Sequence, residues 1–325
     1  MAIVKSYKGF NLDMTCRGFQ YEEGSSYETD SVRVCRKGYH ACEHPNDVLG
    51  YYAPSRSVYH RVVQSGHIER SIGNDSKLAS SSIAIKERIS INEMARDAMH
   101  MAEANHKEMS ASDLLTISSN RDSTYVYSGG TKSVASTNAP KSASHSCGAM
   151  SASISTGSCS VAYSECAYDI SGSTGDWSIS CANGEVGIAC TTGDESATEE
   201  YGGNGISCST GNDCLSSSTG ARSAAITTGR NSCASTVGEE SVAVVVSRHS
   251  CAFAGKASSL AVAWGERSCA KGVKGSLLLL TEWFGNSSVP KYKIVYVDGE
   301  IIKENTAYAL INNVVVEVNP WGDRR

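Results

Sequence analysis

The sequence predicts a mainly β protein built around a two-faced β-solenoid, with smaller units at both ends. Three observations predict this fold. A triplet with an apolar residue between two small residues recurs every nine residues from 133 to 268. Gly stands three residues before most of these triplets, and Thr often precedes that Gly. A short fixed period with turn residues in phase is typical of a solenoid, whose units bury apolar surface only against their neighbours.

The repeat also indicates how many units make one coil. Cys233, Cys251 and Cys269 lie 18 residues apart, and Thr residues before Gly follow the same spacing. Like residues at twice the repeat predict a coil of two units, and about eight 18-residue coils fit the repeat. A triangular coil of three units is the alternative, which the phase of the Cys and Thr residues disfavours. We expect the apolar middle residues to face inward and the small residues outward; the reverse holds if the apolar row meets another subunit.

Four regions follow one another along the chain. We expect a small α+β domain over residues 1–72 and a connection with a capping helix over residues 73–132. The β-solenoid follows over residues 133–276, and a C-terminal β-meander cap with a tail occupies residues 277–325.

The helix of the second region is predicted over residues 90–109. Ser90 and Glu93 match a capping box, and the apolar residues that follow fall near one face. The Met residues of that face indicate core packing rather than a ligand groove. We expect this helix to cap the first coil, because an open solenoid end would expose unpaired backbone.

The C-terminal region changes from the nonapeptide repeat to longer apolar stretches. Asp298-Gly299 and Asn312-Asn313 are hairpin turn signals. The expected strands are Ser276–Phe284, Tyr292–Val297, Glu300–Ile302, Ala307–Ile311 and Val314–Val318.

Composition limits the classes of function. The chain has 325 residues, a net charge of −5 and 13 Cys residues. The negative charge argues against nucleic-acid binding through a strong positive field. The first residues contain no apolar run typical of a signal peptide, and no stretch is long enough to span a membrane. We therefore expect a cytoplasmic protein whose thiols are mostly reduced.

One segment combines residue types that bind metals. Cys35, His40, Cys42 and His44 lie close together, with Cys16 nearby. Thiolate and imidazole ligands suit zinc, but the spacing matches no pair of Cys-x-x-Cys knuckles, so ordinary core residues are the favoured interpretation. The repeat lacks the regular Asp of calcium-binding nonapeptide rolls. Phosphate-loop and nucleophile-elbow motifs are also missing, and the sequence predicts no catalytic residue, no metal and no cofactor.

The middle coils carry an acidic stretch that is interrupted by two aromatic residues. A solvated face is the simpler interpretation, and a binding patch for a basic partner, with aromatic anchors, is the alternative. The candidate binding residues are Asp176, Trp177, Glu185, Asp194, Glu195, Glu199, Glu200 and Tyr201.

Three N-terminal segments carry a resemblance to a known family. They are Tyr7-Lys8-Gly9-Phe10-Asn11, Cys16-Arg17-Gly18-Phe19-Gln20-Tyr21 and Gly38-Tyr39-His40-Ala41-Cys42-Glu43-His44-Pro45. Together they resemble a domain of unknown function that is common in phage and prophage proteins. The resemblance implies a phage or prophage source, and hence the host cytoplasm, and brings no known catalytic residues.

The nonapeptide repeat resembles the head repeats of trimeric autotransporter adhesins. The unit Thr228-Gly229-Arg230-Asn231-Ser232-Cys233-Ala234 keeps that pattern, whereas Val237 separates Thr236 from Gly238 in the next unit. The chain also departs from the adhesins in its Cys content and in lacking an export signal and an anchor. The resemblance makes a trimer one of the oligomers to consider, and surface adhesion is not expected.

These observations lead to three functional hypotheses. The first is a non-enzymatic phage or prophage protein that binds a host protein or a small signalling molecule as a homo-oligomer, for example to inhibit a host defence system. The second is a structural component of the virion, such as a tail or fibre accessory. The third is a metal-dependent enzyme that uses the Cys and His residues of the N-terminal domain.

Overall fold

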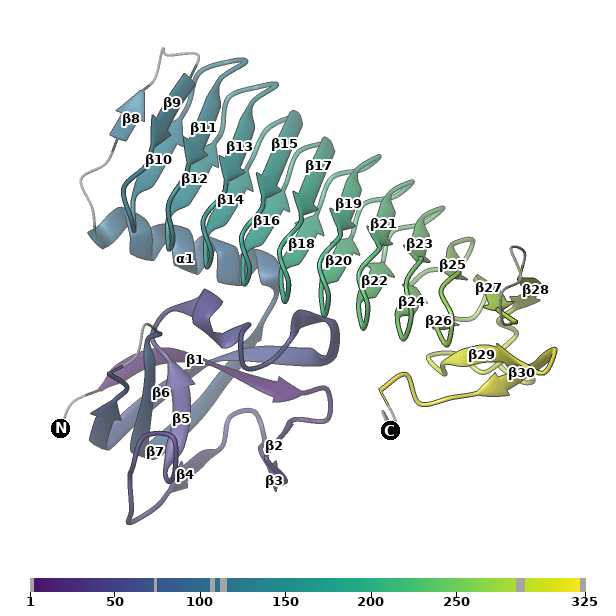
Figure 1. Ribbon diagram of the computed structural model, residues 1–325, viewed down its shortest axis with the longest axis horizontal. Helices are drawn as coiled ribbons and strands as arrows, with labels where there is room; N and C mark the ends of the chain where they lie inside the picture. The colour runs from purple at the N-terminus through teal and green to yellow at the C-terminus, as the bar shows by residue number, and fades with distance from the viewer. Residues whose placement is uncertain (1–2, 73–74, 106–108, 112–115, 285–289, 322–325) are drawn as a thin grey trace.

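The computed structural model describes residues 3–72, 75–105, 109–111, 116–284 and 290–321 of the chain. The predicted fold class is confirmed: the protein is mainly β, with 48% strand and 7% helix, and contains a β-solenoid of about 9 coils over residues 117–280. The N-terminal sheet region lies beside the early coils of the solenoid, and the C-terminal strands lie at its far end (Figure 1).

The N-terminal strands close into a small barrel. The sheet has the order β4-β7-β5-β1-β6, and β7 also pairs with β6, which joins the two sides. Phe10, Val62 and Ile83 belong to its apolar interior. Because β7 is part of this sheet, the barrel continues past residue 72. The elements are β1 (Val4–Asn11), β4 (Ser26–Glu28), β5 (Tyr39–Cys42), β6 (Ser57–Arg70) and β7 (Lys77–Ile89), with a separate hairpin of β2 (Thr15–Cys16) and β3 (Phe19–Gln20) and two 3-10 turns, η1 (Pro45–Val48) and η2 (Pro54–Arg56).

Each solenoid coil adds one strand to each of two sheets. We call them the even sheet and the odd sheet. The even sheet contains β8 (Met109–Ala111), β10 (Tyr125–Ser128), β12 (Ala143–Ser146), β14 (Val161–Ser164), β16 (Ile179–Ala182), β18 (Ala197–Glu200), β20 (Leu215–Ser218), β22 (Cys233–Thr236), β24 (Cys251–Ala254), β26 (Cys269–Gly272), β29 (Tyr308–Ile311) and β30 (Val314–Glu317). The odd sheet contains β9 (Thr116–Ser119), β11 (Val134–Thr137), β13 (Ala152–Ser155), β15 (Tyr168–Ser173), β17 (Val186–Thr191), β19 (Ile206–Ser209), β21 (Ala224–Thr227), β23 (Val242–Val245), β25 (Leu260–Ala263), β27 (Leu277–Glu282) and β28 (Lys291–Tyr296).

The strand register confirms the two-faced coil of 18 residues. Within the odd sheet, Ala224 pairs with Val242, which in turn pairs with Leu260. Within the even sheet, Cys233 pairs with Cys251 in the same parallel manner. Identical positions of successive coils are therefore stacked directly on one another.

The expected orientation of the triplets is wrong. Ser241 and Ala243 are buried between the sheets, whereas Val242, between them, points outward. Small side chains suit the narrow interior, and the Ser hydroxyls are also needed there. The Ser232 N–H donates to Ser250 Oγ at 3.2 Å, and Ser250 Oγ donates to the Gly229 carbonyl at 3.2 Å. The inward Ser hydroxyls thus form hydrogen bonds with backbone N–H and carbonyl groups of the turns, which would otherwise be buried without partners.

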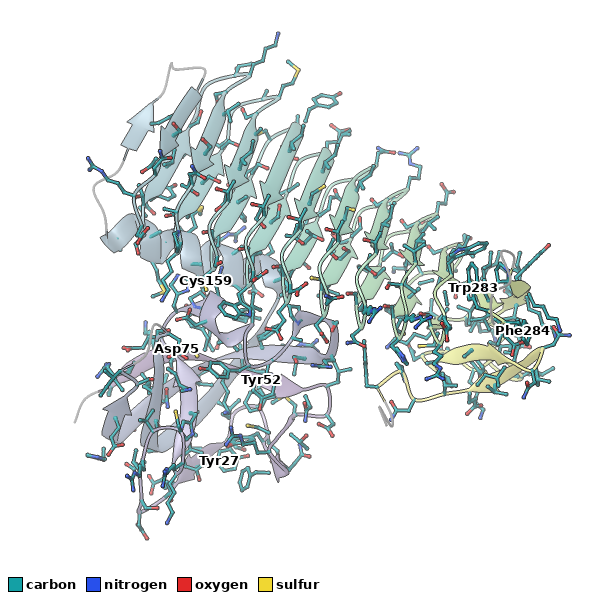
Figure 2. The ribbon with its side chains drawn as sticks, viewed as in Figure 1. Tyr27, Tyr52, Asp75, Cys159, Trp283 and Phe284 are labelled. Atoms are coloured by element: carbon teal, nitrogen blue, oxygen red, sulfur yellow. The ribbon has the colours of Figure 1, made fainter. Side chains whose placement is uncertain are left out.

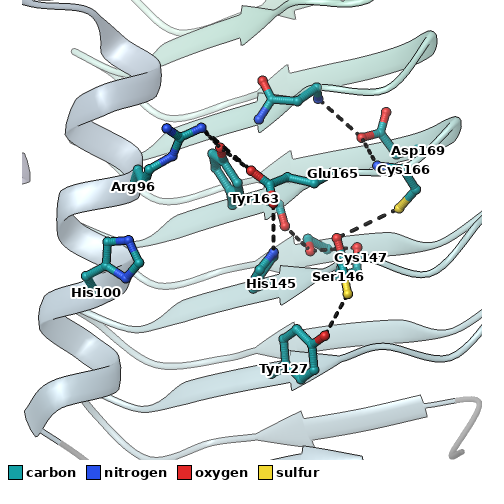
Figure 3. Close-up of polar contacts among 12 residues, drawn as sticks. Arg96, His100, Tyr127, His145, Ser146, Cys147, Tyr163, Glu165, Cys166 and Asp169 are labelled. Atoms are coloured by element: carbon teal, nitrogen blue, oxygen red, sulfur yellow. Dashed lines mark hydrogen bonds and ion pairs between the residues drawn. The ribbon is translucent and has the colours of Figure 1, made fainter. Parts of the chain in front are cut away.

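Helix α1 (Ile91–Asn105) lies lengthwise across the outer face of the even sheet, rather than over the open end of the first coil (Figure 1). It contacts β10, β12, β14, β16 and β18. Figure 3 shows Arg96 of the helix reaching Tyr163, whose hydroxyl accepts a hydrogen bond from Arg96 at 3.0 Å and donates to Glu165 at 2.8 Å. The helix thereby covers the apolar outward residues of these five strands.

We expect Met94→Ala to lower the free energy of unfolding by about 2–4 kcal/mol, the usual cost of emptying a filled apolar site. Met94 is fully buried and belongs to the same apolar cluster as Tyr163 and Ile179. Thermal and urea denaturation measure the effect. His100→Ala, at an exposed position of the same helix, is the control, and an equal loss in both variants would contradict the covering role of the helix.

The C-terminal strands finish both sheets. β28 pairs antiparallel with β27 in the odd sheet, and the hairpin of β29 and β30 extends the even sheet. Asn312 and Asn313 both have positive φ values, 51° and 61°, which fits the expected two-residue hairpin turn. The strand expected over Glu300–Ile302 is not formed; Asp298 Oδ1 instead accepts hydrogen bonds from the Glu300 and Ile302 N–H groups and holds a turn.

No helix within the described parts of the chain has the length and apolar character needed to cross a membrane.

Candidate functional site

A cavity of about 400 Å³ lies in the N-terminal barrel. β1, β5, the hairpin of β2 and β3, and the segment after η1 contribute its walls. Strand β1 turns Ser6, Lys8 and Phe10 toward the interior, as the two-residue period of a strand requires. A lysine at an inward position of a strand is the unusual member of this row.

Lys8 is almost fully buried within this barrel. Its Nζ donates to the His40 carbonyl at 2.8 Å and lies 3.7 Å from Cys16 Sγ. It also lies 5.4 Å from the ring centroids of both Phe10 and Tyr21, a cation–π distance. Burial lowers the pKa of Lys8 from its ordinary value. Among the described residues, no carboxylate forms an ion pair with Lys8.

Aromatic side chains form much of the cavity wall. Phe19, Tyr21 and Tyr39 line it, and the Phe19 and Tyr21 rings meet edge to face with centroids 4.8 Å apart. Tyr52 donates its hydroxyl to Cys16 Sγ at 2.8 Å. Burial raises the pKa of both Tyr21 and Tyr52, so these hydroxyls stay protonated at neutral pH. Figure 2 labels Tyr52, along with Tyr27, which packs against Tyr21 and Tyr39.

The charged side chains that line the cavity are all cationic. Lys8, Arg17, Arg36 and Lys77 line it, and no Asp or Glu stands among the lining residues of the described chain. Outside the lining, Asp75 lies 3.8 Å from Lys77 and accepts a hydrogen bond from Tyr51; Figure 2 labels Asp75. Burial, and secondarily the charge of Lys8, lowers the pKa of His40, which therefore stays neutral. The cavity is thus suited to an anion.

The Cys and His residues considered as zinc ligands are only partly brought together. Cys35, His40 and Cys42 line the cavity, whereas His44 does not. His40 Nε2 accepts the Cys35 N–H at 2.9 Å, and His44 Nδ1 accepts the Asn46 N–H at 3.3 Å. Both imidazoles therefore cap backbone donors. Across the described residues, no group of three or more His, Cys, Asp or Glu side chains has the arrangement to hold a metal ion.

Four of the acidic-patch residues lie on the turns that precede the even strands. Asp176 Oδ1 accepts the Asp194 N–H at 2.9 Å, so one coil's side chain caps the next coil's turn. Trp177 Nε1 donates to Glu195 Oε2 at 2.7 Å, and the indole lies against Gly50 of the N-terminal barrel. These side chains serve the packing of the coils and of the barrel on them.

The other four residues lie elsewhere. Glu199 accepts the Asn92 N–H at 2.7 Å at the start of α1, and Tyr201 donates to Glu199 at 3.2 Å. Glu200 is fully buried inside the solenoid, and Glu185 is exposed. The eight residues therefore occupy separate environments rather than one surface, and their role in binding a basic partner stays a prediction.

Sequence reasoning missed the cavity because its residues come from distant segments. Lys8, Cys16, Tyr39 and Tyr52 belong to different strands and turns. Two signals were present in the sequence: the Cys and His cluster, of which Cys35, His40 and Cys42 line the cavity, and the inward position of Lys8 between Ser6 and Phe10 in an alternating strand.

The cavity falls within a part of the chain that a family model matches. Residues 4–97 match the family described as a domain of unknown function (DUF7666). The expected resemblance to a domain of unknown function is confirmed over this region, which covers well under half of the chain. No curated protein and no solved structure matches the chain.

Proposed function

We propose that this chain is a non-enzymatic binding protein of phage or prophage origin that captures a small anionic signalling molecule in the N-terminal barrel. The supporting observation is the cavity lined by Lys8 and three further cationic side chains, of which only Lys77 has an ion pair among the described residues, with Asp75 outside the lining. A buried ammonium without an anionic partner costs folding free energy, and such a cost is expected where a bound ligand supplies the missing charge.

The volume and the aromatic lining of the cavity indicate further chemical features of the ligand. A cavity of about 400 Å³ is within the range of small-molecule sites. Faces and edges of Tyr and Phe rings favour a flat ring system, and the Tyr hydroxyls offer hydrogen bonds. We therefore assign the ligand to the class of ring-bearing molecules with a phosphate or carboxylate group, such as nucleotides. Sequestering a host signal of this class would inhibit a defence response that depends on it.

The direct test identifies what the protein holds. The full chain and its Lys8→Met variant are purified in parallel from host cells, denatured, and their released small molecules are compared by mass spectrometry. We expect an anionic, ring-bearing compound at near-stoichiometric level with the wild type only. Lys86→Met, at an exposed position of the same barrel, is the matched control and retains the compound. Equal extracts from wild type and Lys8→Met would overturn the proposal.

The same substitution separates a binding role from a structural one. We expect Lys8→Met to keep or raise the melting temperature of the ligand-free protein, because it removes a desolvated charge whose pKa burial has lowered. A structural lysine would give the opposite result, a lower melting temperature in the variant.

Binding is expected to depend on pH. Because burial lowers the pKa of Lys8, part of its charge is lost as the pH rises through that lowered pKa, and an anion binds the protonated form. Affinity for the compound identified above, or for adenosine monophosphate as a first probe, should fall as the pH rises above neutral. Titration calorimetry in two buffers of different ionisation enthalpy should show proton uptake on binding. Affinity that rises with pH would contradict the role of Lys8.

A further inference from the structure

The outer face of the odd sheet has no cover within the described chain. Among the described elements, the odd strands β11 to β27 make their main contacts with neighbouring strands of the two sheets and with the C-terminal strands, and none of them packs closely on α1 or the N-terminal barrel. Helix α1 lies on the even sheet, and the far end of the even sheet packs Cys251 and Cys269 against Ala307 and Trp321. The helix and the C-terminal strands therefore pack on the outer face of the even sheet, whereas no described element packs on the outer face of the odd sheet.

That open face is mostly apolar, with Ser136 as the polar member of its two outward rows. Each odd strand turns two side chains outward, and parallel pairing stacks them into two ladders. One ladder consists of Val134, Ala152, Ile170, Ile188, Ile206, Ala224, Val242, Leu260 and Leu277, and the other of Ser136, Ile154, Gly172, Cys190, Cys208, Ile226, Val244, Val262 and Leu279.

No charged side chain occurs in either ladder. Ile170 is 52% exposed and Ile206 is 42% exposed. The turns at the border carry exposed charges instead, including Lys132, Arg222 and Glu240. An apolar centre with a charged rim is the anatomy of a protein interface, and a continuous exposed apolar patch of this kind is uncommon in monomers.

We propose that this face binds the same face of a second copy of the chain, forming a two-fold symmetric dimer. A single flat apolar surface is self-complementary, and a two-fold axis buries it on both copies at once. A closed trimer needs two different complementary faces on each copy, and the helix and the C-terminal strands already cover most of the even sheet.

The size of the face is sufficient for a specific dimer. At about 4.8 Å between strands and 3.3 Å per residue, the ladders cover roughly 40 Å by 13 Å, or about 500 Å² on each copy. Two copies then bury about 1,000 Å², which reaches the lower bound for a specific interface, and the relief of the side chains adds to this flat area. The exposed Tyr292, Ile294 and Tyr296 of β28 continue the apolar surface at the C-terminal end.

Sedimentation equilibrium of the full chain over a wide concentration range tests the proposal. We expect a reversible dimer for the wild type, and a dissociation constant raised at least about 100-fold by Ile206→Lys, which places a charge in the middle of the face without a partner. Ser217→Lys, at an outward position of the even sheet, is the matched control and should leave the dimer intact. A wild type that stays monomeric, or forms trimers, would overturn the proposal.

A second measurement uses the wild type alone and does not depend on the folding of a variant. Cys190 and Cys208 lie in the proposed interface, and the hydrogen bond from Cys190 lowers the pKa of the Cys208 thiol. The same contact and burial raise the pKa of Cys190, so Cys208 is the reactive thiol of the pair. Alkylation of Cys208 should accelerate several-fold on dilution below the dissociation constant, while that of the exposed Cys147, outside the face, stays constant. Dimers in which dilution leaves the Cys208 rate unchanged would place the interface elsewhere and overturn the proposal. Neither measurement depends on the ligand of the N-terminal barrel.

Discussion

Gly202→Ala is expected to lower the free energy of unfolding by about 3 kcal/mol or more and to disrupt the middle coils. Gly202 stacks between Gly184 and Gly220 in a row of turns, one per coil. A Cβ at Gly202 would overlap the carbonyl of Gly184 in the adjacent coil, so the backbones of two coils would have to separate. Because a solenoid is stable only through contacts between neighbouring coils, the damage should spread on both sides.

Urea denaturation followed by circular dichroism, together with limited proteolysis, measures this effect. Gly203→Ala is the matched control next to it, since a Cβ there would meet only the Ala221 carbonyl, at 3.9 Å, and the residue does not need a positive φ. That variant should be neutral or stabilised by a few tenths of a kcal/mol, through the unfolded state. Similar stability of both variants would show that the stacked turns are not closely packed.

Glu200→Gln is expected to stabilise the protein at pH 8 by about 2–3 kcal/mol and to leave its stability near pH 4 almost unchanged. Glu200 is fully buried in the solenoid, where Ser218 Oγ donates to its Oε2 at 2.6 Å and its Oε1 has no partner among the described residues. Burial raises the pKa of Glu200 to about 7. It likewise raises the pKa of Glu199 to about 7 and that of Asp169 to about 6.

The direction of this pH dependence of stability follows from proton binding by Glu200. Between the ordinary carboxyl pKa near 4.5 and the folded value near 7, the folded state holds a proton that the unfolded state has lost, so stability falls as the pH rises through this window. The unfolding free energy of Glu200→Gln, measured relative to the wild type, should therefore increase from pH 4 to pH 8, because only the wild type loses the contribution of this carboxyl. Glu185→Gln, at an exposed position, is the control. A difference between Glu200→Gln and the wild type that does not change across this range would contradict the interpretation.

The local sequence explains why such carboxyls fit at all. The repeat places Ser at the inward position of most odd strands, but Gly187 and Gly205 stand there in two successive coils. A Cβ on Gly205 would overlap the carboxyl of Glu200, and a Cβ on Gly187 would lie 2.8 Å from Asp169 Oδ1. The missing side chains make the space that the two acids fill. The sequence shows these departures from the repeat, but only the structure shows that they compensate one another.

The sequence by itself determined the solenoid: its two sheets, its 18-residue coil and the phase of its turns. These features depend on contacts between residues at a fixed spacing, so a period in the sequence is sufficient to predict them. It did not determine the direction of the triplets. Both faces of a strand alternate with the same period, and the choice depends on how closely the two sheets approach.

The tertiary structure alone decided where helix α1 lies and how the N-terminal cavity forms. The apolar face of the helix predicted that the helix is buried on one side, but not which surface it packs against. That face could pack equally well on the outward apolar residues of either sheet. The cavity needs β7 to pair with β4, β5 and β6 at once, bringing Lys8, Cys16 and Tyr52 together from segments with no common period. Contacts between residues without a regular spacing leave no pattern in a single sequence. The uncovered outer face of the odd sheet and the positive charge of the cavity are therefore seen only in the folded chain.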